Sequence, residues 1–280
     1  MGEEKKDTKV TEEKPEVKEE KKVEEKVEEK TEYKFPTEVI DLPSEGKIYS
    51  KDSPLNKGQI EIRYMTAREE DILTSANLIK KGVVLQHLLD SLIVTPGITS
   101  ADLILGDKNA VMVAARILAY GPDYKATITH PDTYEESEQV FDLTKCPFKK
   151  IPEDVLFDEN NEITIELPVA KFPIKCKILT ARDEENITKE VNSYKKTGIS
   201  VLPEVTTRLR HSIMEVNGKR DQNSIDSFVQ NLLSRDSLFL RQEMNRIAPN
   251  IDLVQEIDLE GDMIKVEIPL TMDFFWPQSI

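Results

Sequence analysis

The chain has 280 residues, 38% of them hydrophobic, so it is long enough to bury a sizeable core in about two domains of ordinary size. Its formal net charge is −15, and Lys and Arg never gather into a block that could neutralise a phosphate backbone, which argues against DNA or RNA as the main ligand. No apolar run approaches the ~18 residues of a membrane span, and the two cysteines, Cys146 and Cys176, predict a reducing compartment.

Residues 1–34 form a segment of almost pure Lys, Glu, Thr and Val, interrupted by Pro15. The segment holds 13 acidic and 10 basic residues and has no aromatic residue before Tyr33. Such a composition cannot build a core, so we predict a disordered, charged N-terminal tail. A binding segment that orders on a partner is the alternative.

From residue 35 onward the pattern becomes that of a folded protein. An alternating strand leads into helices with wide apolar faces, and two further alternating runs then predict a hairpin. In order, the expected elements are a strand at 59–65, helices at 67–81, 83–94 and 107–120, and hairpin strands at 124–129 and 138–143. Gly82 and Gly121 stand where the first and third helices should end.

The same order of elements is expected again in the second half. The expected elements are a strand at 172–179, helices at 182–196 and 203–216, helical segments near 222–247, and hairpin strands at 251–259 and 263–270. Pro249 closes the last helix, and Gly261-Asp262 lies near the second hairpin turn.

A direct sequence repeat supports this parallel, because residues 60–72 recur as residues 174–186. The offset from Thr66 to Thr180 is 114 residues, which is the size of a small domain rather than of a solenoid turn. We therefore predict an α+β protein made of two related domains in tandem, 35–150 and 151–280, each with a strand, about three helices and a β-hairpin.

The repeated segments also predict two helix starts. Thr66 is followed three residues later by Glu69, and Thr180 by Asp183, which is the spacing of a capping box. Acids in the first turn suit the positive end of the helix dipole. We favour this structural explanation over a catalytic carboxylate cluster.

Three short motifs resemble a known family. They are Leu42-Pro43-Ser44-Glu45-Gly46, Ile104-Leu105-Gly106-Asp107-Lys108-Asn109 before a helix ending in Ala119-Tyr120-Gly121, and Asp273-Phe274-Phe275-Trp276-Pro277. Together they resemble the T4-type bacteriophage baseplate hub and tail assembly protein family over most of residues 37–277.

The resemblance implies a protein of contractile-tailed phages, made in the bacterial host cytoplasm, that either enters the baseplate hub of the virion or chaperones its construction. Its implied partners are other phage tail proteins, namely hub components or the tape-measure protein. Members of the family often carry Cys-Pro-x-Cys in the first hairpin, whereas this chain has Thr129-His130-Pro131-Asp132-Thr133. One histidine cannot replace four zinc ligands, so no metal or other cofactor is carried over.

The sequence offers little support for catalysis. It contains no glycine-rich phosphate loop, and His87, His130 and His211 are far apart in sequence. We therefore expect a non-enzymatic morphogenesis protein with no catalytic residues. An intracellular adaptor with a degenerate zinc module is the alternative, and an acid-base enzyme that uses the helix-start carboxylates is a less favoured one.

The C-terminal aromatic residues Phe274, Phe275 and Trp276 are the candidate partner-binding residues, because large rings dominate protein interfaces and this chain has few of them. The alternative is that these rings lock the last strand onto their own domain.

Overall fold

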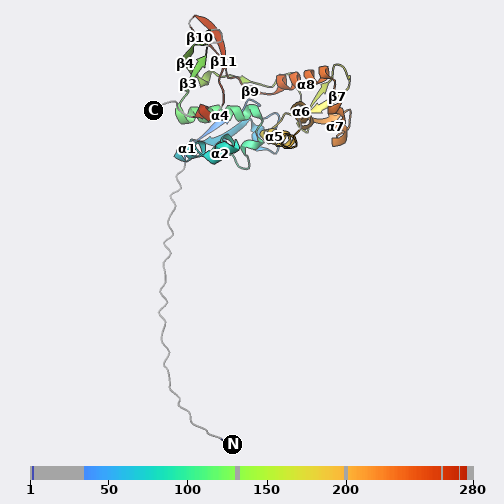
Figure 1. Cartoon of the computed structure of the whole chain (residues 1–280), viewed down its shortest axis with the longest axis horizontal. Helices are drawn as coiled ribbons and strands as arrows, with labels where there is room; N and C mark the ends of the chain where they lie inside the picture. The colour runs from blue at the N-terminus through green and yellow to red at the C-terminus, as the bar shows by residue number, and fades with distance from the viewer. Residues whose placement is uncertain are drawn as a thin grey trace. The chain divides into compact units, whose positions relative to one another are not determined.

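The computed structural model describes Gly2 and residues 35–129, 133–198, 201–259, 261–270 and 272–275. The predicted disordered tail at 1–34 lies outside the described residues, apart from Gly2, and so do His130 and Trp276. Residues 35–280 form one compact unit. Helices and small antiparallel sheets together make up this unit, which confirms the α+β class (Figure 1).

The first half of this unit contains two antiparallel strand pairs around four helices. Its elements are β1 (Thr37–Asp41), β2 (Gln59–Arg63), α1 (Ala67–Leu73), α2 (Ala76–Lys81), α3 (Val84–Leu92), α4 (Leu105–Tyr120), β3 (Asp123–Thr129) and β4 (Glu136–Asp142). β1 pairs with β2 so that Ile40 faces Ile60, and β3 pairs with β4 so that Ala126 faces Gln139.

The second half has a three-stranded sheet, four helices and a hairpin. Its elements are β5 (Phe148–Lys149), β6 (Ile163–Glu166), β7 (Pro173–Cys176), α5 (Ala181–Lys196), α6 (Glu204–Ser212), β8 (Ile213–Val216), α7 (Gln222–Gln230), α8 (Ser234–Ile247), β9 (Asn250–Ile251), β10 (Val254–Leu259) and β11 (Asp262–Glu267). The sheet order is β6-β7-β8, and all its neighbouring strands run antiparallel.

Two predicted helices differ from the structure. The helix expected at 67–81 is interrupted at Thr74, whose hydroxyl donates to the carbonyl oxygen of Glu70. The helix expected at 203–216 ends at Ser212, because the β-branched residues Ile213 and Val216 enter the sheet as β8 and are buried there. The helical segments expected near 222–247 correspond to α7 and α8.

Two separate apolar cores divide the compact unit into what we call the first lobe and the second lobe. The first core is built mainly from residues 42–146, and the second from residues 163–247. The first core also includes Ile251, Leu253 and Ile268. The second predicted hairpin therefore packs on the first lobe, and not on the domain that precedes it in sequence.

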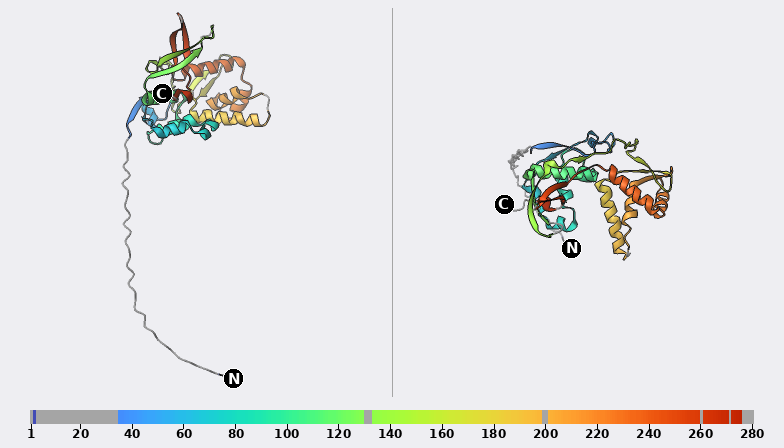
Figure 2. Two further views of the ribbon diagram at one scale, coloured as in Figure 1. Left: turned by 60° about the vertical axis from the view of Figure 1, so that its left-hand side comes forward. Right: turned by 90° about the horizontal axis from the view of Figure 1, so that it is seen from above.

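This arrangement corrects the predicted boundary at 150/151. After α8 the chain returns toward the first lobe through β9, which pairs antiparallel with β5. It then places β10 and β11 next to β3 and β4, so that the two hairpins stand side by side (Figures 1 and 2). The sequence repeat could not show which core each hairpin would cover.

The two lobes meet at the N-terminal end of α4. Gly106 approaches the crossing strand so closely that a Cβ atom there would lie 1.9 Å from the carbonyl oxygen of Pro249. The amide of Asn109 donates to the side chain of Asn250 at 3.1 Å, and the N–H of Ala181 donates to the carbonyl oxygen of Leu103 at 2.8 Å. Only glycine fits at position 106 without moving the crossing strand.

Candidate functional site

The candidate partner-binding rings of the C-terminus lie in the first core. Phe274 and Phe275 are fully buried, with ring centroids 5.4 Å apart, and the Phe274 ring lies 5.1 Å from Tyr124. The Nε of Arg116 donates to the carbonyl oxygen of Phe274 at 2.9 Å. A partner cannot reach these two rings in this fold, so their predicted docking role is corrected to core packing; Trp276 lies outside the described residues.

The other motifs that carry the family resemblance are also joined inside the first lobe. The carboxylate of Asp107 accepts hydrogen bonds from the Ser44 N–H at 3.0 Å, the Ser44 hydroxyl at 2.6 Å and the Tyr49 hydroxyl at 2.7 Å. Burial raises the pKa of Asp107, while the donors from Ser44 and Tyr49 act in the opposite direction. Ser44 and Asp107 thereby hold the loop between β1 and β2 against α4.

The helix-start carboxylates serve as caps and ion-pair partners. Glu69 accepts from the Thr66 N–H at 2.9 Å and pairs with Arg63 at 2.6 Å. Burial alone would raise the pKa of Glu69, but the hydrogen bonds from Arg63 and Thr66 outweigh it and lower the pKa to about 2. A carboxylate held in its ionised form in this way is a poor general acid or base near neutral pH.

The corresponding group in the second lobe is arranged alike. Asp183 accepts from the Thr180 N–H at 3.0 Å and pairs with Lys177 at 2.8 Å. Its pKa is lowered as well, because the bonds from Lys177 and Thr180 outweigh its burial. The predicted capping boxes are thus present at both helix starts.

The two histidines that the structure describes, His87 and His211, lie on different lobes. His87 is exposed on α3, and the Nε2 of His211 lies 3.1 Å from the carboxylate of Glu190 on the second lobe. Among the residues that the structure describes, no group of three or more His, Cys, Asp or Glu side chains is placed to hold a metal ion. No helix in the described ranges is long and apolar enough to cross a bilayer.

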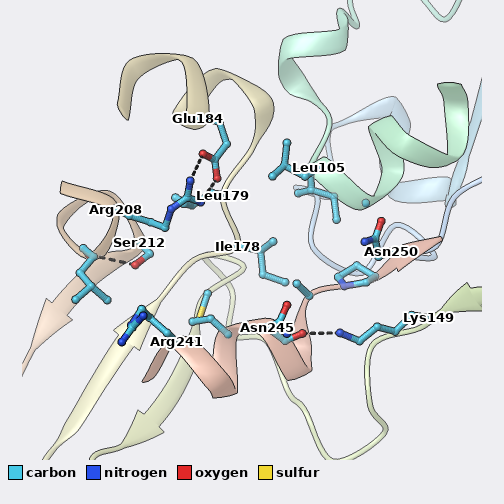
Figure 3. Close-up of a pocket in the computed structure, with 16 residues that line it drawn as sticks. Leu105, Lys149, Ile178, Leu179, Glu184, Arg208, Ser212, Arg241, Asn245 and Asn250 are labelled. Atoms are coloured by element: carbon cyan, nitrogen blue, oxygen red, sulfur yellow. Dashed lines mark hydrogen bonds and ion pairs between the residues drawn. The ribbon is translucent and has the colours of Figure 1, made fainter. Parts of the chain in front are cut away.

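A cavity of about 390 Å³ lies where the two lobes meet (Figure 3). The start of α4 lines one side, and α6, α8 and the segment between β7 and α5 line the other. Its apolar lining consists of Ile104, Leu105, Ile178, Leu179, Leu209, Met244, Ala248 and Pro249. An isolated antiparallel bridge joins Ile104 on one wall to Thr180, which follows Leu179 on the other wall.

Charged side chains stand around this apolar lining. Arg208 pairs with Glu184, with an Nη2 to Oε2 distance of 2.7 Å, and Lys149 donates to the carbonyl oxygen of Asn245 on the opposite side (Figure 3). Arg241 donates only to the carbonyl oxygen of Ser237, at 3.3 Å, and makes no ion pair with any described residue. An apolar cavity with an unpaired guanidinium at its rim can bind a ligand that carries both apolar and acidic groups.

A second hollow of about 400 Å³ extends this cavity along the second lobe. α5 and α6 form its sides, with Ile187, Val191 and Val205 as its apolar residues. Arg208 and Arg241 line both the cavity and this hollow, so the cavity and the hollow form one groove, which we call the basic groove.

Sequence reasoning did not find the basic groove. Its residues come from helices that are separate in the chain, and only their packing brings Arg208 and Arg241 to the same groove. One local signal was available, because Arg241 and Asn245 are four residues apart and therefore lie on one face of a helix. That spacing alone cannot show whether the face meets another lobe.

Comparison with known proteins gives one family. A family model described as T4 bacteriophage base plate protein matches residues 33–197, which is more than half of the chain. No curated protein and no solved structure matches. The matched region contains the sequence of the first lobe up to Cys146 and ends at α5, so the groove residues on α6 and α8 lie beyond it.

Proposed function

The chain belongs to the T4 bacteriophage base plate protein family, and from this membership we propose that it is a non-enzymatic morphogenesis protein of a contractile tail. It would act either as a subunit of the baseplate hub or as a chaperone of hub assembly. In both cases it works by binding other phage tail proteins, hub components or the tape-measure protein, in the cytoplasm of the bacterial host, and the subunit role continues in the virion.

The use of the buried acidic side chains supports a binding role over catalysis. Glu69, Asp107 and Asp236 are fully buried, and each accepts hydrogen bonds that close a loop or cap a helix. None of the three lines the basic groove, whose one apolar cavity is rimmed by cations and by Glu184, a carboxylate already paired to Arg208. A groove of this composition favours recognition of a protein segment.

Comparing infected cells with purified virions tests this function. The full chain, tagged at one end, is captured from infected cells, and its co-purifying proteins are identified and compared with the proteins of purified particles. We expect tail proteins in the captured complex. Presence of the chain in washed virions assigns the subunit role, and its absence assigns the chaperone role. A chain that captures no tail protein and is absent from virions contradicts the proposal.

We also propose that the two lobes arose by duplication of one unit. Leu42-Pro43 and Leu167-Pro168 begin the loops that follow β1 and β6, and each loop is fastened by the third residue of a helix, Asp107 in α4 or Asp236 in α8. Superposing the two lobes tests this origin. We expect Thr66 to fall on Thr180, and a fit that aligns unlike elements contradicts it.

A further inference from the structure

The basic groove gathers positive charge on an acidic chain. Lys149, Lys195, Arg208 and Arg241 line it, against Glu184 and Glu204, whereas the chain as a whole carries −15. The negative charge of Glu184 is compensated by its ion pair with Arg208. The groove therefore has a surplus of cations where the rest of the protein has a surplus of anions, and this local field attracts acidic ligands.

The groove also leaves apolar side chains open to solvent. Leu105 on the first lobe is 43% exposed and Val205 on the second lobe is 45% exposed. Leu105 lies in the cavity between the lobes, and Val205 lies in the hollow beside α5. A ligand that only neutralised the cations would leave these side chains in water, so the occupant needs apolar groups of its own.

The length of the groove limits the size of the occupant. Along α5 it runs from Glu184 to Lys195, which is about 16 Å at the helical rise of 1.5 Å per residue. This length suits a segment of about five extended residues or three helical turns. The occupant is therefore a short stretch of polypeptide and not a whole domain face.

We propose that the basic groove binds an acidic, apolar segment of another phage tail polypeptide, an inference that rests on the proposed function. Carboxylates of the segment meet the free guanidinium of Arg241 and the ammonium of Lys195. Apolar side chains of the segment cover Val205 and enter the cavity beside Leu105.

Two other occupants fit less well. Residues 1–34 of this chain interleave 10 lysines with 13 acids, which would bring cations next to Arg241. Apart from Met1, valine is their only sizeable aliphatic residue type. A second copy that met this groove with its own groove across a two-fold axis would bring two basic surfaces together, and like charges in contact oppose binding.

Photo-crosslinking in the full chain tests the proposal. A photoreactive residue replaces Val205, and the labelled protein is irradiated in infected cells. We expect an adduct with a net-acidic segment of another tail protein. The same label at Val140, which is 56% exposed on β4, serves as the remote control and should not give this adduct.

Charge reversal provides the matched pair of variants. Arg241→Glu should lower the yield of the adduct at least tenfold. Arg235→Glu should leave it unchanged, because Arg235 is exposed on the same helix, does not line the groove and makes no ion pair among the described residues. Arg241→Gln, which removes the charge without adding a new one, is used if Arg241→Glu lowers the melting temperature.

The outcomes separate this inference from the proposed function. An adduct with residues 1–34, with a second copy or with a basic segment overturns the inference, and so does a yield that Arg241→Glu does not change. In each of these cases, continued capture of tail proteins by the tagged chain leaves the proposed function standing. If the unmodified chain captures no tail protein at all, both the inference and the proposed function are overturned.

Discussion

Each lobe holds the loop after one of its strands with a buried carboxylate, but the two carboxylates accept different sets of hydrogen bonds. In the first lobe Asp107 receives one backbone N–H and two hydroxyl groups, from Ser44 and Tyr49. In the second lobe Asp236 receives only the N–H groups of Val169 and Ala170, at 2.8 and 3.0 Å. The loop held by Asp107 is also the longer of the two, spanning 42–58 against 167–172.

The difference shows how the two lobes divide their roles. The first lobe gains additional buried polar contacts and also takes the C-terminal hairpin into its core. The second lobe has the smaller core and contributes most of the cations of the basic groove, including Lys195, Arg208 and Arg241. We infer that the first lobe carries most of the stability and the second lobe most of the binding surface.

The largest expected effect is at Phe274. Replacing Phe274 with Ala should lower the free energy of unfolding by about 4 kcal/mol, because a fully buried ring leaves a cavity and loses its contact with Tyr124. Phe228→Ala in the second lobe should cost about 2 kcal/mol, since that ring is only partly buried against Phe172. Urea unfolding of both variants measures the difference, and equal losses would contradict the proposed division.

The next largest effects are expected at Asp107 and Asp236, the carboxylates that hold the two loops. Asp107→Ala should cost about 3 kcal/mol, because three buried donors lose their acceptor. Asp236→Ala should cost about 2 kcal/mol, because two backbone N–H groups lose theirs. Thermal melts compare the two variants, with Asp107→Asn as the control that retains one acceptor oxygen. A greater loss in Asp236→Ala would reverse the comparison.

Acid should weaken the helix start of the first lobe. The pKa of Glu69 falls from 4.5 in its unperturbed state to about 2 in the fold, so its contribution to stability is full above pH 4.5 and is lost as the pH falls toward 2. Glu69→Gln should be less stable than the unmodified chain by about 2 kcal/mol at pH 6.

The difference in free energy of unfolding between the unmodified chain and Glu69→Gln should become smaller as the pH falls from about 7 to about 2. Asp183→Asn is the matched variant of the second lobe, and its gap should be smaller because Lys177 gives one ion-pair contact where Arg63 gives two. A gap for Glu69→Gln that stays constant down to pH 2 would show that the carboxylate charge is not the source.

The smallest effect concerns an ion pair between the lobes. Arg182 pairs with Asp102 at 2.6 Å, and the Arg182 side chain is 59% exposed. Arg182→Ala should lower the free energy of unfolding by less than about 1 kcal/mol, because the pair is exposed. The loss should be smaller still in about 0.5 M salt, because salt screens exposed charges. A larger, salt-resistant loss would show that this pair contributes more to joining the lobes than an exposed ion pair should.

Much of this fold follows from the sequence because local rules determine it. Thr66 with Glu69 and Thr180 with Asp183 predict two helix starts, and alternating residues predict both hairpins. Arg63 lies three residues before Thr66, and Lys177 lies three residues before Thr180. The ion pairs of these cations with the capping acids therefore also depend on residues close in sequence. These features depend on residues that are close in the chain.

The rest depends on packing between distant segments. The sequence near β10 and β11 does not indicate that these strands will cover the first core. The sequence near Gly106 likewise does not indicate its close approach to Pro249, which lies 143 residues later in the chain. The burial of Phe274 and Phe275 follows from the same return of the chain. The basic groove depends on this return too, because its walls belong to both lobes.

Hydrogen exchange measured by mass spectrometry tests the division into lobes most directly. The full chain and its Phe274→Ala variant are compared segment by segment under native conditions. We predict faster exchange in α4, β3 and β4, which share the first core with Phe274, and unchanged exchange in α6 and α7 of the second lobe. Faster exchange in α6 and α7, with α4 unaffected, would contradict the assignment of the C-terminal segment to the first lobe.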